Sequence, residues 1–135
     1  MFTGACLCGG VRFRINGELA PIQVCHCRQC RKAQGTVFAT NIPVRAEDFI
    51  VEQGEPLLRE YASSPGKYRV FCGQCGSPII SKRDSKPDWV RVRAGTINEA
   101  LTVRPAVHFY VASKAEWWDI NDNLPQHANT YNSEE

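Results

Sequence analysis

The sequence has no apolar run that approaches the roughly 20 residues a membrane-spanning helix requires. Its first ten residues, MFTGACLCGG, lack the basic head and the following apolar stretch that mark a secretory signal peptide. Low-complexity segments and internal repeats are also absent. These absences argue against a membrane span, a secreted precursor and a repeat architecture, so we expect a cytoplasmic protein.

The length of 135 residues indicates one domain, because single domains typically contain roughly 100–200 residues. A composition of 43% hydrophobic and 22% charged residues is that of a globular chain. Glycines and prolines, 10 and 8 of them, are spread along the sequence, which is typical of short elements joined by turns. We therefore expect a single β-rich domain over residues 1–125 and a flexible, polar tail over residues 126–135.

Alternation of apolar and polar side chains predicts short strands, most clearly at residues 11–15 and 89–93. The same reasoning predicts further strands at 22–25, 37–40, 49–51, 57–61, 67–71, 78–81 and 107–111. The strand at 37–40 is expected to stop at Ile42-Pro43, and a turn at 63–66 joins two of the others as a hairpin. Residues 28–34 predict a short helix that Gly35 ends.

The seven cysteines occur in closely spaced groups that read CxC, CxCxxC and CxxC: Cys6 and Cys8, then Cys25, Cys27 and Cys30, then Cys72 and Cys75. In a reducing compartment, clustered cysteines bind metal more often than they form disulfides. In an extended segment, residues i and i+2 project to the same side, so a CxC presents two sulfurs to one ion. A CxxC folds back in a tight knuckle whose backbone angles neighbouring glycines allow. Each pair is therefore half of a four-cysteine zinc site.

These groups suggest a division of the cysteines into four plus three. The two pairs would close a structural zinc site made by Cys6, Cys8, Cys72 and Cys75. Such a site would join the N-terminus to a distant segment and contribute directly to the free energy of folding. The central group would leave one ligand position open, as catalytic zinc sites do, on Cys25, Cys27 and Cys30.

Other interpretations of the CHCRQC segment stay open. Its cysteines could be buried apolar side chains, or a redox pair with one spare thiol. His26 could be a fourth ligand, although in an extended chain its ring points away from the flanking sulfurs. An iron–sulfur cluster is a further alternative, although the spacings fit the common cluster patterns badly.

Basic residues follow this segment closely, namely Arg28, Arg31 and Lys32. They could offset the charge of zinc bound by three thiolates, or bind the carboxylates of an anionic substrate. Alternatively, they form a solvated helix face. The formal net charge is +2 with neutral thiols. Two zinc ions would add four positive charges and seven thiolates would remove seven, so the total gives no reason to expect nucleic-acid binding.

Several segments together resemble the glutathione-dependent formaldehyde-activating (GFA) family, which includes centromere protein V-like domains. They are GACLCGGV at 4–11, CHCRQCRKAQGTVF at 25–38, RVFCGQCGSPI at 69–79, VRAGTI at 92–97, PAVHFYV at 105–111 and AEWWDINDNL at 115–124. The resemblance implies a mainly β, zinc-stabilised β-tent-like fold of two packed antiparallel sheets with one or two short helices. It also implies two zinc ions per chain, divided four plus three as above.

The resemblance further implies carbon–sulfur lyase activity, the condensation of glutathione with formaldehyde to S-(hydroxymethyl)glutathione. Zinc is thiophilic, so a substrate thiol could occupy the open position as a thiolate, beside the aldehyde. His108 is either a general acid or base, or a hydrogen-bonded core histidine. A non-catalytic zinc-stabilised binding module and a thiol-redox sensor are the alternative functions. We expect a small thiol such as glutathione as the partner, with neither nucleic acid nor membrane.

Overall fold

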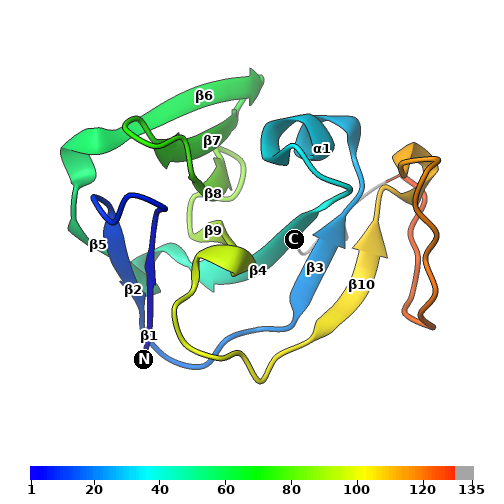
Figure 1. Ribbon diagram of the computed structural model, residues 1–135, viewed down its shortest axis with the longest axis horizontal. Helices are drawn as coiled ribbons and strands as arrows, with labels where there is room; N and C mark the ends of the chain where they lie inside the picture. The colour runs from blue at the N-terminus through cyan, green and yellow to red at the C-terminus, as the bar shows by residue number, and fades with distance from the viewer. Residues whose placement is uncertain (130–135) are drawn as a thin grey trace.

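The computed structural model describes residues 1–129, which form two β-sheets and one short α-helix (Figure 1). In chain order the strands are β1 (Phe2–Ala5), β2 (Arg12–Ile15), β3 (Ile22–Cys25), β4 (Ala39–Arg45), β5 (Phe49–Gln53), β6 (Leu58–Ser64), β7 (Lys67–Cys72), β8 (Pro78–Arg83), β9 (Trp89–Arg93) and β10 (Pro105–Phe109). The helix is α1 (Arg28–Gln34), and short 3-10 helices occur at η1 (Ala46–Asp48), η2 (Glu55–Leu57), η3 (Ala94–Thr96) and η4 (Val111–Ser113). The predicted mainly β fold class is confirmed.

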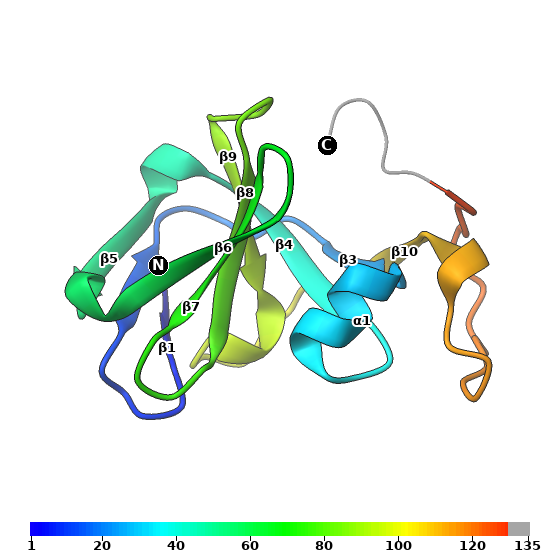
Figure 2. The same ribbon diagram turned by 90° about the horizontal axis from the view of Figure 1, so that it is seen from above.

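The small sheet has the strand order β1-β2-β5, and the large sheet has the order β10-β3-β4-β9-β8-β7-β6. Neighbouring strands are antiparallel except β10 and β3, which are parallel, so the large sheet is mixed where we expected it to be purely antiparallel. In both ribbon views the small sheet lies beside the half of the large sheet that contains β6 to β9 (Figures 1 and 2). The helix α1 lies nearer to β3 and β4.

Local sequence signals account for α1. It begins after Cys27, whose sulfur accepts a hydrogen bond from the backbone N–H of Cys30 as an N-cap does. It ends at Gly35, whose φ of 65° is the left-handed conformation that favours glycine at this position. The predicted helix boundaries are therefore confirmed.

The predicted end of the strand at Ile42-Pro43 is wrong, because β4 continues to Arg45. Proline normally interrupts a sheet because it has no N–H to donate. However, β3 pairs only with residues 39–41 of β4, so one side of β4 has no neighbouring strand at Pro43. The missing donor therefore costs no ladder hydrogen bond on that side. The sequence analysis also missed β1, whose four residues lack a clear alternation.

The large sheet has one apolar face and one basic face. Apolar side chains from its strands pack with the small sheet in the main hydrophobic core, for example Ile42, Val70, Ile80 and Val92 against Phe13 and Ile15. Successive residues of a strand project to opposite faces. The neighbours of these apolar residues therefore point the other way, and several are buried although they are polar or charged: Asn41, Arg69, Ser81, Arg91 and Arg93.

The backbone beyond residue 125 pairs with β10 and η4. His127 donates its N–H to the carbonyl of His108, and Ala112 donates to the carbonyl of Ala128, at 2.9 and 3.0 Å. This hydrogen bonding extends past the end of the predicted domain, while residues 130–135 of the predicted tail lie outside the described part. Among residues 1–129, none of the helices has the length and apolarity to cross a membrane.

Gly4 on β1 lies directly over the ring of Phe13, its partner on β2. A Cβ atom at Gly4 would stand 2.1 Å from that ring, whereas one at Gly95 would meet nothing within 4 Å. We expect Gly4→Ala to lower the free energy of unfolding by about 1–3 kcal/mol through overpacking. Gly95→Ala is the matched control, and urea denaturation measures both. Equal losses in the two variants would contradict the packing of β1 on Phe13.

Candidate metal centres

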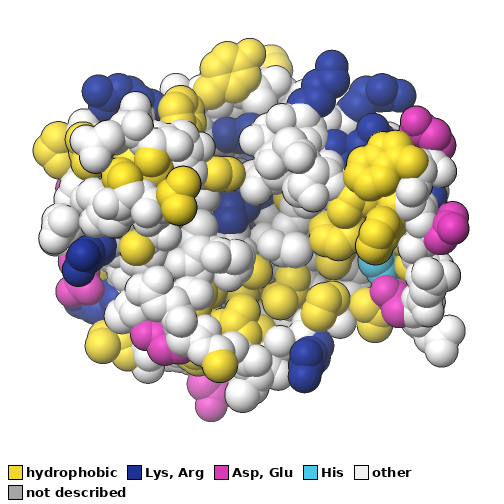
Figure 3. All heavy atoms as spheres, viewed as in Figure 1, with side chains coloured by type: hydrophobic (Ala, Val, Ile, Leu, Met, Phe, Trp, Pro, Cys, Tyr) yellow, Lys and Arg dark blue, Asp and Glu magenta, His cyan; other side chains and the backbone are white. Residues whose placement is uncertain are grey.

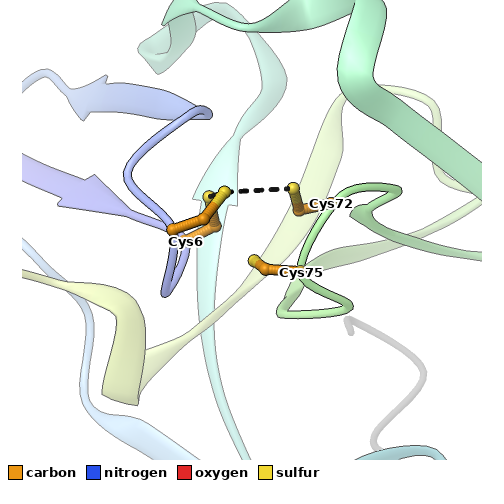
Figure 4. A group of neighbouring side chains, drawn as sticks. Cys6, Cys72 and Cys75 are labelled. Atoms are coloured by element: carbon orange, nitrogen blue, oxygen red, sulfur yellow. Dashed lines mark hydrogen bonds between the residues drawn. The ribbon is translucent and has the colours of Figure 1, made fainter.

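The first cysteine group brings together residues from both ends of a long segment. The Sγ atoms of Cys6, Cys8, Cys72 and Cys75 all lie within 4.8 Å of one another. Figure 4 shows the labelled side chains converging from the loop after β1 and from the turn between β7 and β8. The Cys6–Cys8 and Cys8–Cys72 sulfur distances are 3.5 and 3.9 Å. Zinc with Zn–S bonds of about 2.3 Å holds tetrahedral sulfurs about 3.8 Å apart, so this group fits zinc.

Neighbouring donors favour thiolates in this group. The backbone N–H of Val11 donates to the sulfur of Cys6 at 3.2 Å, and the side-chain amide of Gln74 donates to Cys8 at 3.3 Å. Hydrogen bonding by the Ser77 hydroxyl lowers the pKa of Cys75 to about 5. A thiolate is the form that binds metal, so the lowered pKa of Cys75 favours an ion at this group.

The second cysteine group is local in sequence. Cys25 ends β3, Cys27 caps α1 and Cys30 lies in its first turn, and their Sγ atoms also lie within 4.8 Å of one another. Cys25 and Cys30 are buried, whereas Cys27 is partly exposed. The three sulfurs therefore converge with one side accessible, and a tetrahedral ion here would keep one position for another ligand. Both groups could bind a metal ion, and they divide the cysteines four plus three.

A cavity of about 680 Å³ opens beside Cys27. Its basic lining residues are Arg28, Lys67 and Arg83, from α1, β7 and β8. Lys67 and Arg83 are opposite each other in the pairing of β7 with β8. The volume lies within the range of cavities that enclose small ligands, roughly 300–1,000 Å³. On the face that Figure 3 draws, dark blue Lys and Arg side chains also lie in a recess near the middle of the molecule.

The structure places the predicted basic residues differently. Arg28 lines the cavity. Arg31 donates to the backbone carbonyl of Ser113 at 2.6 Å, and so joins α1 to η4. Lys32 is exposed and is not among the residues that line the cavity. Sequence reasoning missed Lys67 and Arg83, because the sequence did not show which face of the sheet each of them occupies.

Positive charge lies close to the second sulfur group. Arg69 is 8% exposed, and its Nη2 donates to the sulfur of Cys30 at 3.7 Å. Hydrogen bonds from Cys25 and Cys27 lower the pKa of the Cys30 thiol, and the charges of Lys67 and Arg69 lower it further. Burial in turn lowers the pKa of Lys67. The group therefore ionises readily at Cys30, where the cations stabilise the thiolate.

His108 is buried in a chain of hydrogen-bonded side chains. Its Nδ1 lies 2.8 Å from Nε2 of His26, and its Nε2 lies 3.0 Å from the carboxylate of Asp122. Burial lowers the pKa of His26 to about 4, and the hydrogen bond with His108 lowers the pKa of Asp122. Neither histidine lines the 680 Å³ cavity. This geometry favours the core interpretation of His108 over a general acid or base, and it leaves His26 outside the sulfur group.

Comparisons with known proteins agree with this arrangement. The model of the family described as "Glutathione-dependent formaldehyde-activating enzyme" (GFA) matches residues 1–113. A Halomonas elongata protein, provisionally named as a glutathione-dependent formaldehyde-activating enzyme, is 32% identical over 128 residues, 89% of this chain and 81% of its own. A crystal structure of a Rhodobacter sphaeroides protein matches 77% of this chain and 99% of its own, with 25% identity and a TM-score of 0.63. This chain belongs to the glutathione-dependent formaldehyde-activating enzyme family.

Proposed function

We propose that the protein is a zinc-dependent carbon–sulfur lyase that joins a glutathione-type thiol to formaldehyde or a related small aldehyde. The observation that carries this proposal is the position of the second sulfur group, whose accessible side meets a basic cavity of about 680 Å³. Membership of the GFA family supports the same chemistry. A cytoplasmic location is part of the proposal, because the thiols must stay reduced.

Both cysteine groups fit zinc by donor type and sulfur spacing, so the proposal includes two zinc ions per chain. The first group would hold a structural ion on Cys6, Cys8, Cys72 and Cys75. The second would hold an ion on Cys25, Cys27 and Cys30. Zinc bound there would supply a thiophilic position at which a substrate thiol is ionised near neutral pH.

The residues of the cavity would bind and orient the thiol. Glutathione carries two carboxylates, and Arg28 and Arg83 present cationic donors to the space beside Cys27. Holding the sulfur and the aldehyde in one small volume lowers the entropic part of the barrier to addition. Arg31 supports this site indirectly, through its hydrogen bond to Ser113.

Protein purified without a chelator should contain two zinc ions per chain. The physical reason is that the seven sulfurs form two separate groups, each compact enough for one ion. Elemental analysis measures the ratio. A single zinc ion per chain, or iron with sulfide, would contradict the four-plus-three division.

Cys72→Ser should lower the melting temperature much more than Cys27→Ser. Cys72 belongs to a group that joins residues 64 positions apart in the chain, so its ion closes a long loop. Cys27 belongs to a group whose members are neighbours in sequence, so its ion closes almost no loop. Calorimetric melting of both variants checks this, and equal melting temperatures would contradict the division of labour between the two groups.

Binding of glutathione near pH 7 should release about one proton, because a thiol that binds at the second cysteine group must ionise. Calorimetry in buffers of different ionisation enthalpy counts the proton. S-methylglutathione keeps both carboxylates but cannot ionise at sulfur, so it should bind at least about tenfold more weakly. If it binds as tightly as glutathione, the sulfur does not reach the second group and the lyase proposal fails.

Glutathione should also bind better than 2-mercaptoethanol, and Arg83→Gln should reduce this advantage because it removes a cation from the cavity wall. Arg59→Gln is the matched control. Arg59 is an exposed residue of β6 that donates to the carbonyl of Pro56. Rising salt should weaken the binding of glutathione more than that of the uncharged thiol. If both variants bind glutathione with the same affinity, Arg83 does not contact the thiol substrate.

A further inference from the structure

The strands beside the second sulfur group carry positive charge without acidic side chains. The sequences of β3, β4, β7, β8 and β9 contain no Asp or Glu. Lys67 and Arg69 lie on the face of β7 that meets α1, as the contact of Arg69 with Cys30 shows. Within residues 1–129, no acidic side chain forms an ion pair with either of them.

The two cations have different positions relative to the cavity. Lys67 is half-buried and lines it together with Cys27. Arg69 is not among the residues that line the cavity, and its buried Nε and Nη1 have no hydrogen-bond partner. Arg69 therefore adds positive potential at Cys30, while the ammonium group of Lys67 can touch a ligand. An acidic side chain, Asp84, also lines the cavity, where its carboxylate accepts a hydrogen bond from the hydroxyl of Tyr68 at 3.2 Å.

Arg69 contacts Cys30, and Lys67 lines the cavity together with Cys27, so both positive charges are close to the second sulfur group. The carboxylates of glutathione are several bonds away from its sulfur, so they would lie farther out in the cavity when the sulfur is at Cys27. Formaldehyde is uncharged and has no carboxylate for a cation to bind. A carboxylate attached directly to the aldehyde carbon would instead lie beside the sulfurs, next to Lys67. Lys67 is half-buried and has no carboxylate partner among residues 1–129, so it could pair with such an anion.

We propose that the carbonyl substrate is an anionic aldehyde that carries a carboxylate on the reacting carbon, as glyoxylate does, and that Lys67 binds this carboxylate. This inference rests on the proposed function and names the second substrate of the same site. Lys67 would be a specificity-determining residue, and Arg69 would strengthen the local positive potential without touching the ligand.

The reaction balances without any further reactant. The thiol loses its proton, and the thiolate sulfur forms a bond to the aldehyde carbon. The π electrons of the C=O bond move to its oxygen, which takes up a proton from water. The sum is RSH plus OHC–COO⁻ giving RS–CH(OH)–COO⁻, with no leaving group, oxidant or reductant.

The test compares glyoxylate with methylglyoxal, a neutral aldehyde of nearly the same shape, and with formaldehyde, using zinc-loaded protein and glutathione. We expect kcat/KM for glyoxylate to exceed that for methylglyoxal at least about tenfold, because only glyoxylate can form a charge-assisted hydrogen bond with Lys67. Lys67→Met should bring this ratio close to one. Lys82→Met is the matched control, since Lys82 is the neighbour of Arg83 on β8 and pairs with Glu60 at 2.6 Å.

A binding measurement accompanies the kinetics. Oxamate has the carboxylate of glyoxylate but does not react, so calorimetric titration should show at least about tenfold weaker binding to the Lys67→Met variant than to the Lys82→Met variant. Equal binding would overturn the proposal. So would an equal loss of rate with all three aldehydes in Lys67→Met, because Lys67 would then only offset the thiolate charge.

The failures of the two proposals are distinguishable. Turnover of formaldehyde, without any preference for glyoxylate over methylglyoxal, would overturn the anionic substrate and support the lyase proposal. If none of the aldehydes reacts, the lyase proposal fails. The oxamate titration then still decides whether Lys67 binds a carboxylate.

Discussion

Side chains on β7, β8 and β9 alternate between two faces of the large sheet, and both the core and the candidate site depend on this alternation. On one face, Val70, Ile80 and Val92 bury apolar surface against the small sheet. On the other face, Arg69, Ser81 and Arg91 are buried although they are polar or charged. A shift of one residue in strand register would put charges into the core and apolar groups beside the sulfurs. The packing of the core therefore also determines where the positive charge lies.

The two cysteine groups have different consequences for the fold because of their separation in sequence. The first joins the loop after β1 to the turn after β7, two segments that share no strand pairing. An ion there would link the small sheet to the large one. The second group lies at the junction of β3 and α1, where the backbone is already held by strand pairing and by the helix cap of Cys27. We therefore expect the second cysteine group to contribute little to the stability of the fold, so one of its sides can stay accessible.

The segment that follows η4 lies outside the family match, yet it contacts β10, which pairs with the strand that carries Cys25. The carboxylate of Asp122 is hydrogen-bonded to His108, and the other ring nitrogen of His108 is hydrogen-bonded to His26. His26 lies between Cys25 and Cys27 in the sequence. The contact with His108 thus holds the side chain of His26 in place. The backbone N–H of His26 also donates to the carbonyl of Phe109, at 2.9 Å. These contacts support the segment that carries Cys25 and Cys27, as outer partners would if these cysteines bind a metal ion.

The sequence by itself determined the features that depend on near neighbours. Short spacings between cysteines indicated which thiols can share an ion, because a few residues of chain limit how far sulfurs can separate. Gly35 and the alternation at 89–93 likewise determined the end of α1 and the limits of β9. The predicted substrate contacts Arg28, Arg31 and Lys32 were neighbours of the sulfurs in sequence, which is why they were considered.

Only the tertiary structure decided which side chains meet the sulfurs from a distance. Lys67 and Arg69 are about forty positions from Cys30 in the chain, and their place follows from how β7 is aligned with β8 and how the large sheet faces α1. Alternation shows that Arg69 and Val70 point in opposite directions, but not which of them points to the core. The parallel pairing of β10 with β3 and the continuation of β4 through Pro43 depend on distant partners in the same way. Contacts across long stretches of chain are set by the packing of whole sheets, and no local pattern of residues encodes them.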